Sequence, residues 1–356
     1  MKVMQLLYSG LGGHGSVVFS MIAADHDRLF EHQLLFYGIE EVKQDYLEKC
    51  EHLGIEQRYV PKKSSINSWF KIYRALKKMK PDVLLVHATT TIFPCKFYAF
   101  LAGKKIIVVD HQANEKKRMQ DWIFAFFNSV LANYYVVLTK HSSKGILKKI
   151  PYIKSKLRTI PNGIDTSLYK PIAVEGNSRK IISMVARMNA LRDFETLISA
   201  FDELATEHLQ IELHLAGDGP DFGKVQAAKN KAQHSDRILL LGSLAESEIV
   251  QLLQQTYIYV HSSLADNMST AVMQAMSCGL PIIVTDIEAL HLLIDKDENG
   301  LFFEVKNKEQ LCLNLLRLLN ESSLAKELGK AARKKAEQQF SQEDMFLQYK
   351  NLIESK

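Results

Sequence analysis

Two arginines, Arg187 and Arg192, stand five residues apart between a short apolar run and a helical pattern. Guanidinium groups keep their charge at neutral pH and bind phosphate oxygens through two parallel hydrogen bonds. A pair of them just after a predicted strand can hold a diphosphate and stabilise negative charge that develops on it. The ordinary alternative is two surface arginines without a ligand, so the rest of the sequence has to decide between these interpretations.

A second polar segment, residues 262–270, leads into a helical pattern that ends at Gly279. Ser269 or Thr270 is suited to cap the start of this helix, and a glycine is suited to follow its end. The free N–H groups at a helix N-terminus attract phosphate. We therefore expect the segment to contact a ligand through Asp266, Asn267, Met268, Ser269 and Thr270.

Gln274 lies eight residues after Asp266, on the same predicted helix. A polar side chain on an otherwise small and apolar helix is a candidate ligand. An ordinary position on the helix surface would explain it equally well.

Glycines follow two predicted strands. Residues 10–15, which include Gly12 and Gly13, fit the pattern GxGxxG, and Gly217, Asp218 and Gly219 follow a later strand. Such turns let the backbone approach a phosphate or a sugar closely. Each turn alone is equally consistent with a tight strand-to-helix connection. The first would also suit a dinucleotide dehydrogenase, with Glu40 as a partner for the ribose.

These segments lie between apolar runs that alternate with helical patterns. In the first half we predict strands at 2–8, 33–37, 83–87, 105–110 and 134–138, and helices at 17–24, 65–79 and 91–102. The alternation restarts with strands at 180–185, 211–216, 238–241, 258–261 and 281–285, and helices at 194–204, 222–234, 246–256, 269–278, 309–319 and 322–339. Continuous apolar strands separated by helices predict parallel sheets covered on both faces.

The length of 356 residues suits two domains of common size. We predict an α/β chain of two doubly wound, Rossmann-like domains, residues 1–170 and 171–339, with a polar linker at 171–180. Residues 340–356 are predicted to form a helix that returns to the first domain. Because ligands of such sheets bind outside the carboxyl ends of the strands, we expect the chemistry in a cleft between the two domains.

Composition excludes several other classes. The four cysteines form no CxxC pair, which argues against a disulfide framework and a zinc knuckle. The N-terminus lacks the long apolar region of a signal peptide. The most apolar stretch, residues 122–138, is interrupted by polar residues and falls short of the roughly 20 residues that span a membrane. We expect a cytoplasmic protein with reduced thiols.

The net charge of +5 is unevenly distributed. No acidic residue lies between Asp121 and Asp165, and the predicted helix at 65–79 is basic and amphipathic. A solvated basic face and a surface that contacts an anionic membrane are both consistent with this pattern. No nucleic-acid recognition module accompanies the charge.

Together these segments resemble glycosyltransferase family 4, the retaining enzymes of GT-B fold that assemble bacterial polysaccharides and glycolipids. The resemblance covers nearly the whole chain. It rests on Gly12-Gly13, residues 161–165 (PNGID), Arg187 with Arg192, residues 216–220 (AGDGP), 241–242 (LG), 274–283 (QAMSCGLPII), 299–301 (NGL) and 340–341 (FS).

The resemblance implies roles for individual residues. Arg187 and Arg192 would hold the donor diphosphate, and His111 would lie near the sugar and the acceptor. The family's pair of glutamates falls at Asp266, which would meet the donor sugar, and at Gln274, which would meet the ribose hydroxyls. Arg192 stands where lysine is usual, and Gln274 offers the ribose an amide in place of a carboxylate, so we expect a weaker contact there.

The resemblance thus implies a retaining glycosyltransferase that uses a nucleotide-diphosphate sugar and a glycan or lipid-linked acceptor in cell-envelope polysaccharide assembly. We expect neither a metal nor another cofactor, since no DxD pair follows a strand and two arginines can replace the cation. A peripheral contact with the cytoplasmic face of the inner membrane would fit the basic first domain. The alternatives are a nucleotide-sugar epimerase of the same fold, a dehydrogenase, and a non-catalytic member that binds sugar nucleotide or serves as a scaffold.

Overall fold

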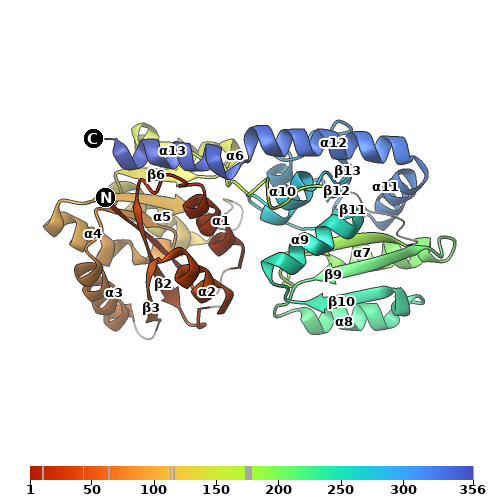
Figure 1. Cartoon of the computed structure of the whole chain (residues 1–356), viewed down its shortest axis with the longest axis horizontal. Coiled ribbons are helices and arrows are strands. Elements are labelled where there is room, and N and C mark those ends of the chain that lie inside the picture. The colour runs from red at the N-terminus through yellow and green to blue at the C-terminus, as the bar shows by residue number, and fades with distance from the viewer. Residues whose placement is uncertain are drawn as a thin grey trace. The chain divides into compact units, whose positions relative to one another are not determined.

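The computed structural model describes residues 1–9, 12–42, 44–62, 65–112, 114, 117–172 and 179–355. Gly10 and Leu11 of the glycine-rich run and most of the predicted linker at 171–180 lie outside these ranges. The chain forms two compact units, one of residues Met1–Gly163 with the segment from Gln342 onward, the other of Ile164–Ser341. Figure 1 shows a sheet flanked by helices in each unit.

The sheet of the first unit has seven parallel strands in the order β3-β2-β1-β4-β5-β6-β7. They are β1 (Lys2–Tyr8), β2 (Glu31–Gly38), β3 (Glu56–Pro61), β4 (Val83–Val86), β5 (Lys105–Asp110), β6 (Tyr134–Val137) and β7 (Leu157–Thr159). Successive side chains of a central strand point to opposite faces of the sheet and enter two different cores. The central strands are therefore buried on both faces. In β1, Met4 and Leu6 join one core and Leu7 joins the other.

The helices of the first unit cover both faces of this sheet. They are α1 (Gly12–Ala23), α2 (Gln44–Leu53), α3 (Ser65–Met79), α4 (Ile92–Ala102), α5 (Met119–Leu131), α6 (Lys140–Lys149) and α13 (Gln342–Glu354), with the 3₁₀ turns η1 (Thr89–Thr91) and η3 (Pro151–Ser155). Buried residues of α3 to α6 share one core, and those of α1 and α2 share the other. Helix α13 packs against α1.

The sheet of the second unit has six parallel strands in the order β10-β9-β8-β11-β12-β13. They are β8 (Lys180–Val185), β9 (Ile211–Ala216), β10 (Ile238–Gly242), β11 (Thr256–His261), β12 (Ile282–Thr285) and β13 (Leu301–Phe303). The helices are α7 (Phe194–Ala205), α8 (Phe222–Lys231), α9 (Glu246–Gln255), α10 (Thr270–Ser277), α11 (Lys308–Asn320) and α12 (Ser322–Gln339), with the turns η4 (Ser235–Arg237) and η5 (Glu288–Leu290).

The boundary between the units falls at Gly163, seven residues before the predicted position. Tyr169 explains the difference, because it packs inside the second unit. It is 2% exposed, and its hydroxyl accepts a hydrogen bond from Gln274 Nε2 at 2.8 Å. Its carbonyl oxygen also accepts bonds from Ser277 Oγ and Arg333 Nη1.

Each sheet reverses its strand order at one point. In the first unit this point lies between β1 and β4, and in the second between β8 and β11. Neighbouring connections leave in opposite directions there, which opens a crevice outside the carboxyl ends of the two strands. The segments that follow β8 and β11 carry Arg187, Arg192 and residues 262–270.

Candidate functional site

Backbone hydrogen bonds join the two segments at the reversal point of the second sheet. Asp193 N donates to Ser262 O at 3.1 Å, and Leu264 N donates to Leu191 O at 2.9 Å. Residues Arg192 and Ser263 also form an isolated antiparallel bridge. The pairing fixes the loop after β8 against the loop after β11, and so brings together residues that are distant in the sequence.

The guanidinium of Arg192 is held from several sides. Its Nη2 lies 2.9 Å from Asp266 Oδ2, and its Nη1 donates to Ser263 Oγ at 2.5 Å and to the Ala265 carbonyl at 2.8 Å. The buried Nε has no hydrogen-bond partner among the residues that the structure describes. The contacts hold the charge of Arg192 in one place at the strand ends.

Asp266 is the centre of this group. Its Oδ2 also lies 3.0 Å from His261 Nε2, and its Oδ1 accepts from the Asn267 backbone N–H at 2.8 Å. Burial favours the neutral acid, but the hydrogen bond from His261 and the charge of Arg192 outweigh burial and lower the pKa of Asp266. Burial also favours the neutral form of His261, and for a histidine this lowers the pKa, against the opposing effect of Asp266. Asp266 therefore carries a negative charge and orients Arg192.

Arg187 follows β8 by two residues and is exposed. The residues on either side of Arg187 form backbone hydrogen bonds with the end of β9 and the loop after it. Ala186 N donates to Ala216 O at 3.0 Å, and Met188 N donates to Asp218 O at 3.0 Å. Arg187 thus projects from a backbone that is fixed on both sides. Its long side chain can reach an anion that lies at the strand ends.

The glycines of the loop after β9 are required by close backbone approach. Gly217 has φ +142° and Gly219 has φ +155°, and a Cβ at either position would collide with the carbonyl oxygen of Ala186 or Met188. Asp218 is exposed, and its Oδ1 accepts from the Gly219 N–H at 2.7 Å. These residues lie beside Arg187 at the strand ends.

Helix α10 begins as predicted, with Ser269 as its N-cap. Ser269 Oγ accepts from Val272 N at 3.4 Å, while Met268 is buried and Thr270 and Asn267 are partly exposed. The free N–H groups of the first turn thus lie directly after the Arg192–Asp266 pair in the chain. A helix dipole adds positive potential there.

Gln274 lies in the interior of the second unit. It is 6% exposed, and its Nε2 donates to the Tyr169 hydroxyl. The amide nitrogen is therefore used within the unit and does not lie on the helix surface. Helix α12 supports the same contact, since Arg333 donates to the carbonyls of Thr166 and Tyr169.

The remaining predicted residues belong to the first unit. Gly12 and Gly13 form the first turn of α1, and His111 follows β5 at the strand ends. His111 Nε2 lies 2.8 Å from His87 Nδ1, and the two rings stack. His87 Nε2 lies 2.7 Å from the Oε1 of Gln5. Because that amide oxygen can only accept, a neutral His87 accepts at Nδ1 from His111 Nε2–H, which makes Nδ1 the basic nitrogen of His111.

Asp110 anchors the loop that carries His111. Its Oδ2 accepts from the Tyr135 hydroxyl at 2.6 Å and lies 2.8 Å from Lys117 Nζ. Both carboxylate and ammonium are almost fully buried. His111 is thus placed by an ion pair and a histidine neighbour that sequence reasoning did not identify.

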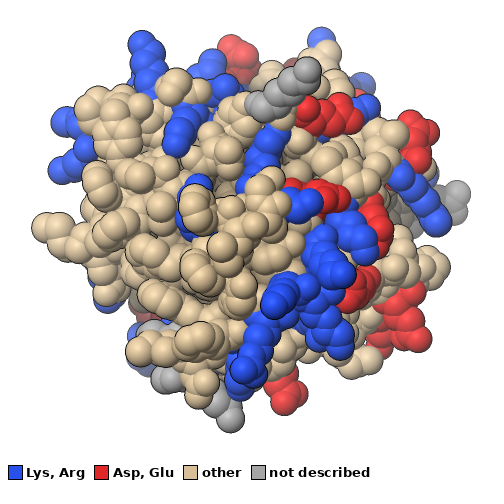
Figure 2. Space-filling model, turned by 90° about the vertical axis from the view of Figure 1, so that its left-hand side faces the viewer, with Lys and Arg blue, Asp and Glu red and all other residues tan. Residues whose placement is uncertain are grey.

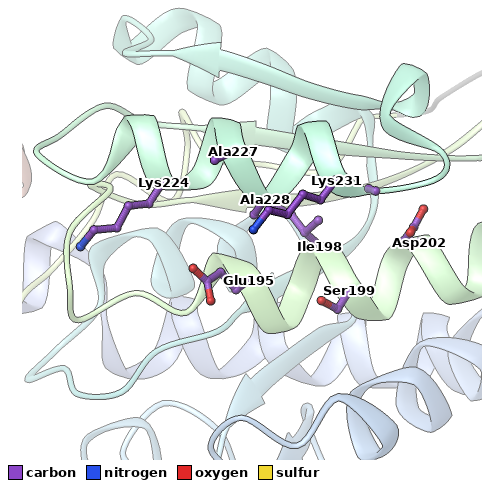
Figure 3. A pocket seen from close by; sticks show the side chains of 9 residues that line it. Glu195, Ile198, Ser199, Asp202, Lys224, Ala227, Ala228 and Lys231 are labelled. Atoms are coloured by element: carbon purple, nitrogen blue, oxygen red, sulfur yellow. The ribbon is translucent and has the colours of Figure 1, made fainter.

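A surface groove of about 390 Å³ lies away from these residues, between α7 and α8 (Figure 3). Glu195 and Asp202 of α7 face Lys224 and Lys231 of α8 across it. Asp202 already accepts hydrogen bonds from the backbone N–H groups of Gln233 and His234. The groove lies on the helical layer and not at the strand ends, so we assign it no role.

Metal ligands and membrane-spanning helices are both missing from the described part of the chain. Within it, no three His, Cys, Asp or Glu side chains gather in a way that could hold a metal ion. None of its helices has both the length and the apolar character needed to cross a membrane. The expectation of metal-free chemistry stays a prediction.

The predicted residues thus fall into groups. Arg192, Asp266, Asn267 and the start of α10 come together, with Arg187 beside the Gly217–Gly219 loop. The sequence did not reveal His261 and Tyr169, which complete these contacts. The only signal for His261 is a polar residue at the last position of a buried strand.

Comparison with known sequences identifies both halves of the chain. Residues 11–168 match the family described as Glycosyltransferase Family 4, and residues 166–335 match Glycosyl transferases group 1. The chain belongs to glycosyltransferase family 4. The matches leave the dehydrogenase interpretation of the glycine-rich turn without support.

Curated relatives of this family 4 member are distant. N-acetyl-alpha-D-glucosaminyl L-malate synthase of Bacillus anthracis is 25% identical over 205 residues, which are 55% of this chain and 53% of that protein. The phosphatidylinositol N-acetylglucosaminyltransferase gpi3 subunit of Schizosaccharomyces pombe is 22% identical over 232 residues, 63% of this chain and 50% of that protein. The chain therefore spans about half the length of these relatives.

The fold has close counterparts among solved structures. Anabaena HepE in complex with UDP and glucose superposes with a TM-score of 0.86 at 17% identity, covering 100% of both chains. This likeness, together with two parallel sheets, confirms the predicted GT-B fold of the family 4 chain.

Proposed function

We propose that this chain transfers a sugar from a nucleoside diphosphate to a hydroxyl group of a glycan or lipid-linked acceptor, with retention of configuration and without a metal. We place the reaction in cell-envelope polysaccharide assembly, at the cytoplasmic face of the inner membrane. One observation carries the proposal. Two guanidinium groups and a helix N-terminus lie at the reversal point of one parallel sheet.

The donor diphosphate would lie outside the carboxyl ends of β8 and β11. Arg192 is held there by Asp266 and Ser263, and Arg187 extends from a fixed backbone two residues after β8. Groups that are positioned before the substrate arrives stabilise developing charge without reorganising, and in many enzymes this effect accounts for most of the rate enhancement. The complex of Anabaena HepE with UDP supports this choice of donor class.

In the proposed reaction the bond between the anomeric carbon and the phosphate oxygen breaks. The acceptor oxygen forms the new bond on the same face, and its proton passes to a departing phosphate oxygen. The sugar carries positive charge in the transition state and the diphosphate gains negative charge. Arg187, Arg192 and the first turn of α10 would stabilise that negative charge, a task that a divalent cation performs in other enzymes.

His111 would act on the other side of the reaction. The network of His87 and Gln5 leaves Nδ1 as the basic nitrogen of His111. We propose that this nitrogen accepts a hydrogen bond from a hydroxyl of the sugar or of the acceptor. His87 and Gln5 would be positioning residues that hold the ring.

One observation favours a second candidate, a non-catalytic member of the fold that binds sugar nucleotide. Gln274 stands at the position expected to meet the ribose, yet its amide nitrogen is used by Tyr169. A member with a weakened ribose contact would bind donor less tightly and could have lost turnover.

Thermal-shift measurements with UDP-, GDP-, ADP- and CMP-sugars, followed by turnover assays, separate these functions. The proposed enzyme is stabilised by one donor and transfers its sugar in the presence of EDTA. Binding without turnover on any acceptor would favour the second candidate. Loss of turnover in EDTA, restored by Mg²⁺ or Mn²⁺, would refute the metal-free mechanism.

A further inference from the structure

Helices α3, α4 and α5 of the first unit, with the turn η3, expose large aromatic side chains to solvent. Phe100 is 77% exposed, Phe70 63% and Phe97 57%. We use the name aromatic face for Trp69, Phe70, Phe97, Phe100, Phe126 and Tyr152. Soluble monomers rarely leave so many large apolar side chains uncovered in one region, so such a patch indicates a partner.

Ring contacts connect these helices into one surface. The ring of Trp69 lies 5.4 Å from that of Phe93, which lies 5.2 Å from Phe127. Phe127 in turn contacts Phe126, whose ring lies 6.1 Å from Tyr152. Phe97 of α4 also contacts Tyr73 of α3, with 5.2 Å between ring centroids, so aromatic contacts join α3, α4, α5 and η3.

The charge on the helices around the aromatic face is almost entirely positive. Helices α3, α4, α5, α6 and the turn η3 together carry ten Lys and Arg and a single acidic residue, Asp121. Figure 2 looks at the side of the molecule where α3 and α4 lie. It shows a broad uncharged expanse bordered by bands of Lys and Arg, with Asp and Glu beside these bands on the right and at the top.

Lysine predominates among these cations. All of them except Arg74 are lysines, and those of α3 and η3 are exposed. Protein–protein interfaces are enriched in arginine and depleted in lysine. Lysines that flank exposed aromatics are instead typical of surfaces that lie on a bilayer, where their stems cover apolar area and their ammonium groups reach the lipid headgroups.

We propose that the aromatic face docks on an anionic phospholipid bilayer. Its rings enter the boundary between headgroups and acyl chains, and the lysines of α3, α6 and η3 contact the phosphates. Each lysine near such a surface strengthens binding several-fold and does so less at high salt. The inference rests on the first unit alone and does not depend on the donor chemistry of the second unit.

Sedimentation with vesicles tests the proposal on the full chain. We expect binding to vesicles of equal parts phosphatidylglycerol and phosphatidylcholine, and little binding to phosphatidylcholine alone. The double variant Phe97→Ser with Phe100→Ser should bind at least about tenfold more weakly, because each exposed phenyl ring contributes to insertion. Leu209→Ser with Leu313→Ser is the matched control, since both side chains are exposed in the second unit.

Charge reversal probes the cationic contribution separately. Lys71→Glu with Lys78→Glu should weaken binding to the anionic vesicles about tenfold or more, whereas Lys330→Glu with Lys334→Glu on α12 should not. Thermal unfolding of each variant confirms that it is folded. Equal vesicle binding by the wild type and the Phe97, Phe100 variant would overturn the proposal.

A spectroscopic measurement locates the contact. Trp69 and Trp122 are the two tryptophans, so Trp122→Phe leaves Trp69 as the reporter. We expect acyl-chain bromination of the vesicle lipid to quench Trp69 fluorescence. Unquenched fluorescence on bound vesicles would contradict insertion. A lipid-free dimer that dissociates in the Phe97, Phe100 variant would show that the face covers a second copy of the chain instead.

Discussion

The guanidinium of Arg192 and the carboxylate of Asp266 form an ion pair at the strand ends of the second unit, with 2.9 Å between Nη2 and Oδ2. Their side chains are only 18% and 11% exposed. The family resemblance implies separate tasks, the diphosphate for Arg192 and the donor sugar for Asp266. The contact indicates that the Asp266 carboxylate also orients the Arg192 guanidinium.

Asp266→Asn tests this dependence. The amide keeps the shape of Asp266 but loses the charge that orients Arg192, so we expect kcat/KM to fall by about a hundredfold, a cost of about 2.7 kcal/mol in transition-state stabilisation. Steady-state kinetics with the donor measures the loss. Asp236→Asn is the control, because Asp236 is exposed in the turn η4, which precedes β10 and so does not follow a strand end. An equal loss in both variants would argue against the orienting role.

The stability of the second unit should fall on acidification. The pKa of Asp266 is lowered in the folded state, so its contribution is present above the ordinary carboxyl pKa of about 3.9 and is lost as pH falls through the folded value. The pKa of His261 is also lowered, so stability declines as pH falls below the ordinary imidazole value of about 6.5.

Urea unfolding between neutral pH and pH of about 5 measures the histidine part of this effect. His261→Gln should flatten the dependence of the free energy of unfolding on pH. His291→Gln is the comparison variant, because His291 also pairs with an aspartate but its side chain is half exposed. The same slope in wild type and His261→Gln would contradict the assignment.

Gly217→Ala should damage the loop after β9. The new Cβ would collide with the Ala186 carbonyl at a positive φ, so we expect a loss of about 3 kcal/mol in the free energy of unfolding and weaker donor binding. Gly223→Ala provides the contrast. It lies in α8, where an added Cβ would meet no other atom. Alanine should therefore stabilise the helix by about 0.5–1 kcal/mol. Unfolding curves that rank the two variants the other way would refute the explanation.

The bond between Tyr169 and Gln274 should be measurable as a coupling. Tyr169→Phe leaves the buried amide nitrogen of Gln274 without an acceptor and should cost about 1–3 kcal/mol. Adding Gln274→Met removes the second polar partner and should recover part of this loss. A double-mutant cycle by urea unfolding gives the coupling energy, and strictly additive effects would show that the contact does not stabilise the protein.

Apolar runs in the sequence located the central strands well. The predicted bounds of β1, β5, β8 and β9 agree with the structure residue for residue. Strands β3, β7 and β13 were not predicted, because β3 is a half-exposed edge strand and β7 and β13 have three residues each. Short or half-exposed strands lack the long apolar run that indicates a buried strand.

The site could be predicted by residue type but not by partner. Helix-capping rules placed Ser269 correctly at the start of α10. The pairing of Arg192 with Asp266 depends on β8 lying beside β11, which is a matter of strand order that local patterns do not fix. For the same reason the sequence leaves Gln274 either a ligand or a residue of the helix surface and does not indicate Tyr169, whereas the two side chains bond to each other in the interior.

We propose that the donor diphosphate lies against Arg187 and Arg192. Calorimetry tests it with UDP, GDP and ADP, using whichever binds the wild type most tightly. Arg187→Ala should weaken that binding by about a hundredfold, because it removes a charge-assisted pair of hydrogen bonds, whereas Arg179→Ala, at an exposed arginine of the same unit, should not. Wild-type affinity in the Arg187→Ala variant would contradict the binding of the diphosphate by this arginine.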